Sequence, residues 1–219
     1  MLTDSQSTSR DIVDAVKVIA AGLESSGYCV VSSLMPDTLL NDLFVHFKSL
    51  NDNTFVQAGI GRESAFQLNQ FVRSDEIHWL SGTHPTTAEY FSLMEEIRLD
   101  LNRRLFLGLF DYECHYAFYS CGAFYKKHYD AFKGNNTRVV STILYLNPAW
   151  SPGDGGELVI YHPDSGEILE TVEPLFGRMV VFLSEEFPHE VLPVVMPRYS
   201  LTGWFRINNS LGETIDPPG

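Results

Sequence analysis

The sequence predicts a mainly β domain with flanking helices, an α+β chain in which the helical part comes first. From about residue 111 onward, short β-branched and aromatic runs are separated by turn signals such as Pro152–Gly156, a texture typical of a sandwich or barrel. Before about residue 110, apolar residues recur instead at helical spacing. The length of 219 residues and the apolar fraction of 44% suit one domain over residues 1–219 with a substantial core.

The helical part predicts three helices: about 9–25, about 36–47 and about 86–106. Gly27 follows the first and is expected to end it, and Pro36 suits the first turn of the second. Thr86 or Thr87 is the expected N-cap of the third helix. Residues 28–32 read as a strand between the first two helices.

The second part predicts seven short strands: 112–120, 138–147, 156–162, 167–173, 178–184, 189–195 and 199–208. The helices are too few to form a domain of their own, so we expect them to pack outside the sheet as a buttress. Residues from about 1 to 110 are therefore interpreted as a helical support, and those from about 111 to 208 as the β-core.

Charge and composition exclude several classes of function. The formal charge is −13 and basic stripes are missing, which disfavours nucleic acid as a partner. No apolar run reaches 18 residues, so no membrane span is expected. The N-terminus shows no secretory signal, and three cysteines cannot all pair, so we expect a cytoplasmic protein of bacterial type with reduced thiols.

Four dispersed residues carry the strongest chemical signal. His128 and Asp130 form a His-x-Asp pair, and His189 follows much later in the chain. Within a strand, residues i and i+2 face the same side, so the pair is expected to converge on one ion with His189 as the third ligand. Two imidazoles and one carboxylate form the facial triad that leaves positions open on ferrous iron. Arg198 is suited to clamp a dicarboxylate co-substrate.

A second His-x-Asp triplet, His162–Asp164, competes with the first. It contains Pro163 and runs into a Pro-Asp-Ser-Gly turn, so we interpret it as a hairpin tip. The other histidines have no partner at ligand spacing and are expected to be surface or capped core residues: His46, His78, His84 and His115. The cysteines lack C-x-x-C spacing, which disfavours a zinc site.

With the motifs HYD, PHEV and RYSLTGW in this order, the chain resembles the iron- and 2-oxoglutarate-dependent prolyl hydroxylases. It is most similar to the branch with the bacterial prolyl hydroxylase-domain proteins and the animal oxygen-sensing enzymes. The resemblance covers roughly residues 55–208. It implies a double-stranded β-helix core of the jelly-roll or cupin type, with Fe(II), 2-oxoglutarate and dioxygen as cofactors and co-substrates and ascorbate as a reductant.

The resemblance also implies roles for single residues. It places iron on His128, Asp130 and His189. It assigns the far carboxylate of 2-oxoglutarate to Arg198 and Tyr145. Three further residues are expected to line the co-substrate pocket: Tyr119, Thr202 and Trp204. From the residues alone, Tyr145 and Trp204 are better interpreted as packed core aromatics, and the resemblance is what favours a functional role.

The resemblance further implies a substrate side. Arg138 matches an arginine near the substrate entrance, and Arg73 and Asp75 lie in a segment that resembles the strand after a mobile finger loop. Residues 52–72 would then form a lid over the site. The implied substrate is an exposed prolyl loop of a protein, and a translation elongation factor is one candidate.

Alternatives stay open at this point. The chain could be a non-catalytic iron and 2-oxoglutarate sensor, or a hydroxylase of a non-prolyl or small-molecule substrate. Nucleic acid demethylases of the same chemistry carry a second arginine where this chain has Trp204, and iron halogenases replace the carboxylate that Asp130 supplies. Both of these readings are disfavoured.

Overall fold

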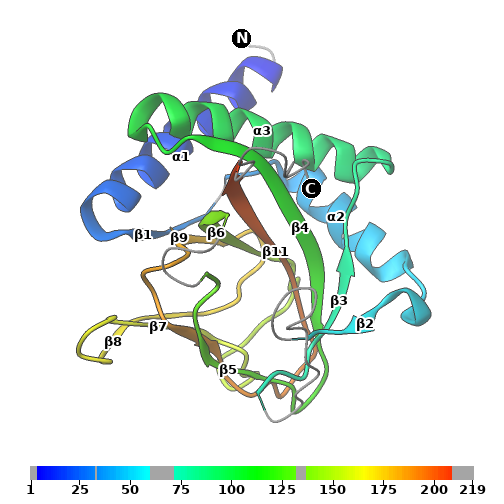
Figure 1. Ribbon diagram of the computed structural model, residues 1–219. Helices are drawn as coiled ribbons and strands as arrows, with labels where there is room; N and C mark the ends of the chain where they lie inside the picture. The colour runs from blue at the N-terminus through cyan, green and yellow to red at the C-terminus, as the bar shows by residue number, and fades with distance from the viewer. Residues whose placement is uncertain (1–3, 33, 60–71, 132–136, 209–219) are drawn as a thin grey trace, which may run out of the picture.

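A computed structural model describes residues 4–32, 34–59, 72–131 and 137–208 of the chain (Figure 1). Within them the helices are α1 (Asp4–Ser26), α2 (Asp37–Ser49) and α3 (Pro85–Leu105), with a short 3-10 helix η1 (Asp52–Thr54). All three predicted helices are present, although α1 begins earlier than expected. Among the described helices, none combines the length and the apolar character that a membrane crossing requires.

The helix ends show why the boundaries lie where they do. At the end of α1, Gly27 adopts φ 76°, and its N–H donates to the carbonyl of Leu23. The prediction that Thr86 or Thr87 caps α3 is wrong. His84 is the N-cap, and its Nδ1 accepts the Thr86 N–H at 3.3 Å. Pro85 fixes the first helical turn and brings no N–H of its own, so the helix begins there and the residue before it supplies the cap.

The strands pair into two antiparallel sheets. The strands are β1 (Tyr28–Val31), β2 (Val56–Gln57), β3 (Glu76–Trp79), β4 (Leu109–Tyr119), β5 (Tyr125–His128), β6 (Arg138–Tyr145), β7 (Leu158–Tyr161), β8 (Ile168–Val172), β9 (Met179–Leu183), β10 (His189–Val191) and β11 (Arg198–Ile207). One sheet has the order β1-β9-β6-β11-β4-β3-β2, and the other has the order β5-β10-β7-β8. The seven predicted strands correspond to β4 and to β6 through β11.

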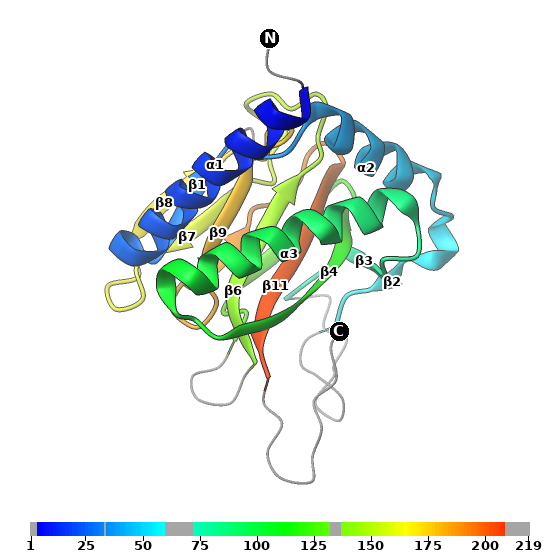
Figure 2. The same ribbon diagram turned by 90° about the horizontal axis from the view of Figure 1, so that it is seen from above.

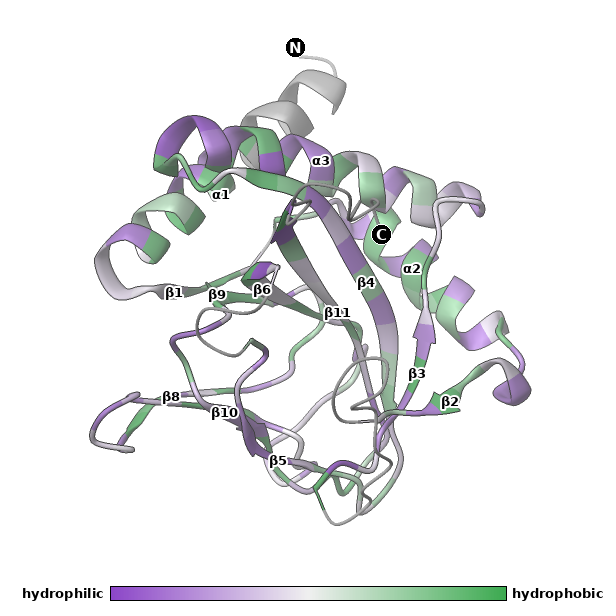
Figure 3. Ribbon diagram, viewed as in Figure 1, coloured by the Kyte–Doolittle hydropathy of each residue, from purple (hydrophilic) through white to green (hydrophobic). Residues whose placement is uncertain are grey.

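The larger sheet packs on both of its faces because side chains alternate along each strand. On β4, Tyr112, Cys114 and Tyr116 belong to the core beneath the helices. Ala117 and Tyr119 belong instead to the core between the two sheets. Figure 3 shows the resulting change of hydropathy from residue to residue along β4. The face toward the smaller sheet is therefore the enclosed one.

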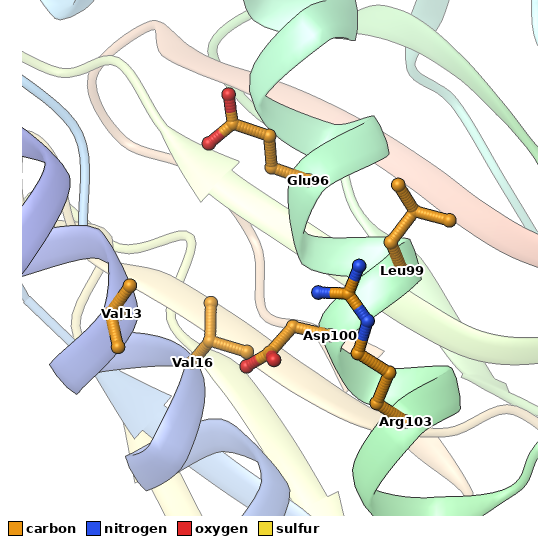
Figure 4. Close-up of a pocket in the computed structure, with 6 residues that line it drawn as sticks. All are labelled: Val13, Val16, Glu96, Leu99, Asp100 and Arg103. Atoms are coloured by element: carbon orange, nitrogen blue, oxygen red, sulfur yellow. The ribbon is translucent and has the colours of Figure 1, made fainter.

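The helices form a layer on the opposite face of the larger sheet (Figure 2). They bury apolar residues such as Leu43, Met94 and Leu101 against that face. This arrangement confirms the predicted mainly β chain with a helical buttress. A groove of about 250 Å³ runs between α1 and α3, as Figure 4 shows, and is lined by Val13, Val16, Glu96, Leu99, Asp100 and Arg103. It lies on the helical side of the molecule.

Two predicted segments have different outcomes. His162 lies in the turn between β7 and β8, where its Nδ1 accepts the N–H groups of Asp164 and Ser165, so the reading of a hairpin tip is confirmed. Of the predicted lid at residues 52–72, the first part forms η1 and β2, and β2 pairs with β3. Residues 60–71 lie outside the described part of the chain.

Candidate active site

Three residues from the smaller sheet and its connections meet in one cluster. His128 ends β5, and His189 begins β10 directly opposite it in the antiparallel register. One carboxylate oxygen of Asp130 lies 3.6 Å from His128 Nε2 and 3.7 Å from His189 Nε2. All three ligand atoms lie within 4.8 Å of one another, a spacing that one metal ion could bridge.

The local explanation for this convergence differs from the prediction. β5 ends at His128, and Asp130 lies in the bend that follows, so the pair does not share a strand face. The pairing of β5 with β10 aligns the two histidines instead. The bend after β5 then turns Asp130 toward them.

Both imidazoles are oriented by backbone carbonyls. His128 Nδ1 lies 2.8 Å from the carbonyl of Lys126, and His189 Nδ1 lies 3.0 Å from that of Phe187. A carbonyl only accepts, so each Nδ1 carries the proton and each Nε2 presents its lone pair. Such partners fix the tautomer and the ring orientation of metal-binding histidines.

Asp130 is held by a hydroxyl pair. Ser141 on β6 donates to Asp130 Oδ2 at 2.7 Å, and its hydroxyl lies 2.9 Å from that of Ser184. Burial alone would raise the pKa of Asp130, but His189, His128 and the Ser141 hydrogen bond outweigh it and hold the pKa well below its usual range. Burial, followed by the neighbouring His128, lowers the pKa of His189 to about 4. A carboxylate beside a neutral imidazole is the protonation state that a divalent metal requires.

A second part of the site is built around Arg198, the first residue of β11. Its guanidinium is buried, with Nε donating to the carbonyl of Gly156 at 2.9 Å and Nη1 to Ser200 Oγ at 3.0 Å. Its Cζ lies 4.8 Å and 5.0 Å from the ring centroids of Tyr119 and Tyr145. Within the described ranges Arg198 forms no ion pair with a carboxylate.

Tyr145 and Trp204 each bury a polar atom without a partner. Among the described residues, the Tyr145 hydroxyl and Trp204 Nε1 find no hydrogen-bond partner, and both side chains lie on the enclosed face of the larger sheet. Burial of unpaired polar groups costs free energy, so such groups call for an explanation. Thr202 lies between Arg198 and Trp204 on the same face of β11, opposite Ile143 of β6 and His115 of β4.

The residues predicted to contact substrate fall into two groups. Arg138 at the start of β6 lies over the Trp204 ring, with its Cζ 3.5 Å from the centroid. Arg73 donates two hydrogen bonds to Asp75, at 2.6 Å and 2.8 Å, and its guanidinium lies over the ring of Tyr125. Asp75 is buried and both of its oxygens are engaged by Arg73, so the geometry favours a supporting role for Asp75 over direct substrate contact.

Sequence reasoning missed several residues of this site. Tyr125 stacks on His128 with the ring centroids 3.4 Å apart. Because Arg73 lies over the Tyr125 ring, this stacking links Arg73 to the His-Asp-His cluster. His115 lies buried beside Trp204 and Trp79. The sequence predicted only a surface or capped core position for His115, and nothing in the sequence singled out Ser141, because a serine within a strand carries no distinctive pattern.

Comparisons with known proteins agree with this geometry. The sequence model described as "2OG-Fe(II) oxygenase superfamily" matches residues 114–206. The crystal structure of a Pseudomonas putida prolyl-4-hydroxylase is 37% identical in sequence with a TM-score of 0.79, covering 88% of this chain and 98% of that one. The fold is also similar to that of a Trichoplax adhaerens prolyl hydroxylase in complex with a hypoxia inducible factor peptide fragment, at 22% identity and a TM-score of 0.79, covering 94% of each chain.

Among curated proteins, Egl nine homolog 1 from Mus musculus is 27% identical over 199 residues. The match covers 87% of this chain and 49% of that protein, so this chain spans about half the length of that relative. Together with the two facing sheets, the structural matches confirm the predicted jelly-roll core.

Proposed function

Because the chain belongs to the 2OG-Fe(II) oxygenase superfamily, we propose that it hydroxylates a prolyl residue of a protein substrate. Fe(II) is its metal, 2-oxoglutarate and dioxygen are its co-substrates, and succinate and carbon dioxide are the by-products. One observation carries the proposal: the smaller sheet bears the His-Asp-His cluster, and the enclosed face of the larger sheet bears a buried arginine, Arg198, that has no acidic partner among the described residues.

The triad fits a ferrous ion. His128 and His189 would bind through Nε2 and Asp130 through the oxygen that faces both rings. Three protein ligands leave further positions on the ion for co-substrate and oxygen. The Ser141 hydroxyl donates a hydrogen bond to the other carboxylate oxygen of Asp130. This favours binding of a metal by Asp130 through a single oxygen.

The pocket around Arg198 fits the far carboxylate of 2-oxoglutarate. A buried guanidinium without a counter-ion is unfavourable, and a bound carboxylate would neutralise it through paired hydrogen bonds. The Gly156 carbonyl and Ser200 hold the guanidinium in place. The unpaired hydroxyl of Tyr145 supplies a further donor for the same carboxylate.

Iron and 2-oxoglutarate together supply the oxidising power, with one oxygen atom passing into succinate and the other into the substrate as a hydroxyl group. The protein residues position and enclose the reactants. Thr202 and Trp204 follow Arg198 on the same face of β11, so they would line the pocket that holds the co-substrate. Arg138 and the Arg73–Tyr125 pair border the side on which a substrate would enter.

The protein substrate follows from the relatives and stays part of the proposal. The Trichoplax adhaerens enzyme is in complex with a peptide, which supports an exposed prolyl loop as the target. A translation elongation factor is our first candidate for the protein that carries it. We also propose a cytoplasmic location, because all three cysteines are free thiols, as a reducing compartment would keep them.

The activity is tested by succinate release. The purified chain with Fe(II), oxygen and 2-oxoglutarate should convert 2-oxoglutarate to succinate, and Asp130→Ala should abolish the conversion, since the metal would lose one of its three ligands. A wild-type chain that binds 2-oxoglutarate and never turns it over would contradict the proposal and favour a sensor.

The substrate class needs a separate experiment. Proteomes of cells with and without the gene should differ by peptides that gain the mass of one oxygen atom on proline. If each such oxidation maps to another residue type, or only a free metabolite is oxidised, the prolyl assignment fails while the oxygenase assignment stands.

A further inference from the structure

Four charged side chains form a ladder across the enclosed face of the larger sheet. Asp111 and Glu113 come from β4, Arg206 from β11 and Arg138 from β6. Arg206 binds Asp111 through Nε at 2.9 Å and Nη2 at 2.6 Å, and its Nη1 lies 3.5 Å from Glu113. Arg138 Nε donates to the other oxygen of Glu113 at 2.8 Å. The charges therefore alternate in sign along the ladder.

Glu113 is the central member of this ladder. The register places Arg206 beside Arg138, and Glu113 contacts both guanidinium groups. Without Glu113, these two positive charges would be neighbours with no carboxylate between them. The side chains of Glu113 and Arg138 are 13% and 15% exposed, which limits the screening of the two charges by water. Removal of one partner from a largely buried charge pair leaves the other charge uncompensated.

The ladder also determines where Arg138 lies. Glu113 pairs with Trp204 in the β4–β11 register, so Arg138 must reach across β11 to meet it. Its guanidinium thereby lies over the Trp204 ring at 3.5 Å. On its other side Trp204 is paired in register with Ser141, the residue that donates to Asp130. Trp204 and Ser141 thus connect the end of the ladder at Arg138 to the Asp130 carboxylate.

We propose that Glu113 is a positioning residue: it fixes the Arg138 guanidinium over Trp204 and so shapes the substrate side of the site. This inference rests on the proposed function. The link from Glu113 to the site is the hydrogen bond that it accepts from Arg138, so it acts through that arginine. Loss of Glu113 removes the carboxylate that holds the Arg138 guanidinium over the indole, which lowers the efficiency of substrate use and leaves 2-oxoglutarate binding intact.

The test has one readout that needs no substrate. In ¹⁵N-labelled protein without metal, Glu113→Ala should shift the Trp204 indole N–H resonance, assigned through Trp204→Phe. Glu113→Gln keeps an oxygen that can accept from Arg138, and it should restore the position in large part. Glu95→Ala is the matched control, because it removes the glutamate partner of Arg98 on α3, away from the site.

The second readout is kinetic. With a peptide pool of fixed central proline and randomised flanks, Glu113→Ala should lower hydroxylation at subsaturating peptide by about tenfold, since a displaced positioning group costs rate at the reacting centre. Succinate release without peptide should change less than about twofold. In an Arg138→Met background, Glu113→Ala should have no further effect on hydroxylation, because it acts through that arginine.

Each outcome decides between explanations. An unchanged indole resonance in Glu113→Ala, or equal losses of hydroxylation from Glu113→Ala in the presence and absence of Arg138, would overturn the positioning role. Should Glu113→Ala fail to fold, Glu113→Leu, which has a similar volume and no acceptor oxygen, takes its place in the same cycle with Arg138→Met. If the wild type releases no succinate at all, the proposed function fails, while the indole shift still reports on Glu113.

Discussion

Ser141 is the residue on which the orientation of Asp130 depends. It is fully buried, and it is the hydroxyl donor to the carboxylate oxygen that does not face the histidines. Hydrogen-bond partners of metal ligands typically matter for metal affinity by one to two orders of magnitude. We expect Ser141→Ala to weaken Mn(II) binding, used as a redox-stable probe, by about tenfold in calorimetric titration.

The control for this prediction is Ser92→Ala. Ser92 is an exposed serine on α3 whose hydroxyl donates to a carbonyl of its own helix. It should leave Mn(II) affinity unchanged. If Ser141→Ala binds Mn(II) as tightly as the wild type, the carboxylate does not depend on this hydrogen bond for its position.

His115 gives a prediction about stability. Burial, followed by the charges of Arg73 and Arg138, lowers its pKa to about 3, against 6.5 for an unperturbed histidine. Between these values the unfolded chain binds a proton that the folded chain does not, so the free energy of unfolding falls as the pH falls through this window. We expect His115→Phe to remove about 1 kcal/mol of this dependence between about pH 6.5 and about pH 5.5, because the unfolded imidazole is about half protonated at the upper pH and about nine-tenths protonated at the lower.

Urea unfolding at about pH 6.5 and about pH 5.5 gives the free energy of unfolding at each pH. The effect is the difference between wild type and variant in how much this free energy changes with pH. This comparison separates the effect of the proton from any loss of packing in the variant, because a packing loss lowers the free energy of unfolding by the same amount at both pH values. Equal slopes in wild type and His115→Phe would mean that His115 titrates normally in the fold.

At the level of single residues, the sequence identified the groups that could act as ligands and clamp, because histidine, aspartate and arginine have distinctive chemistry. It could not identify groups that act through geometry. Ser141, Tyr125 and Glu113 are ordinary strand residues until the pairing of strands brings them beside Asp130, His128 and Arg138.

Among the elements, the turn at residues 152–156 supports the co-substrate pocket. Gly156 has φ 78°, its carbonyl accepts from Arg198, and a Cβ at this position would lie 2.8 Å from Arg198 Cδ. Gly156→Ala should therefore displace the guanidinium. We expect the KM for 2-oxoglutarate in the succinate assay to rise by about tenfold, the loss typical of one hydrogen bond to a charged group.

Gly153 in the same turn is the matched control. It has φ 101°, but nothing lies within 4 Å of a Cβ built there. Both alanine variants should lose roughly 1 kcal/mol of stability from backbone strain, whereas only Gly156→Ala should change the KM. An equal rise of KM in Gly153→Ala would trace the effect to the turn as a whole and not to Arg198.

Elements with a strong local pattern were predictable, and short ones were not. Long strands such as β4 and β11 follow from their alternating aromatic and β-branched residues. β5 has four residues with two exposed lysines, and it forms because it pairs with β10. The prediction that His128 and Asp130 converge is confirmed, but its local reason is wrong, because β5 ends at His128 and Asp130 lies beyond it.

Over the whole molecule, the two faces of the larger sheet have different roles: one packs the apolar core, and the other carries residues of the candidate site. The face under α1, α2 and α3 is an apolar core, whereas the enclosed face carries Arg198, Trp204 and the charge ladder. Hydrophobic pattern alone predicts both layers. It does not give the strand order, because pairings such as β11 between β4 and β6 join segments far apart in the chain.

The central claim is that the triad and Arg198 hold ferrous iron and 2-oxoglutarate together in one site. An anaerobic titration of the Fe(II)-loaded chain with 2-oxoglutarate tests it, since chelation of ferrous iron by a 2-oxo acid produces a visible charge-transfer absorption. We predict a saturable band for the wild type, no band for Asp130→Ala, and at least about tenfold more 2-oxoglutarate for half-saturation in Arg198→Met. A wild type without the band, or an Arg198→Met variant that saturates like the wild type, would contradict the account.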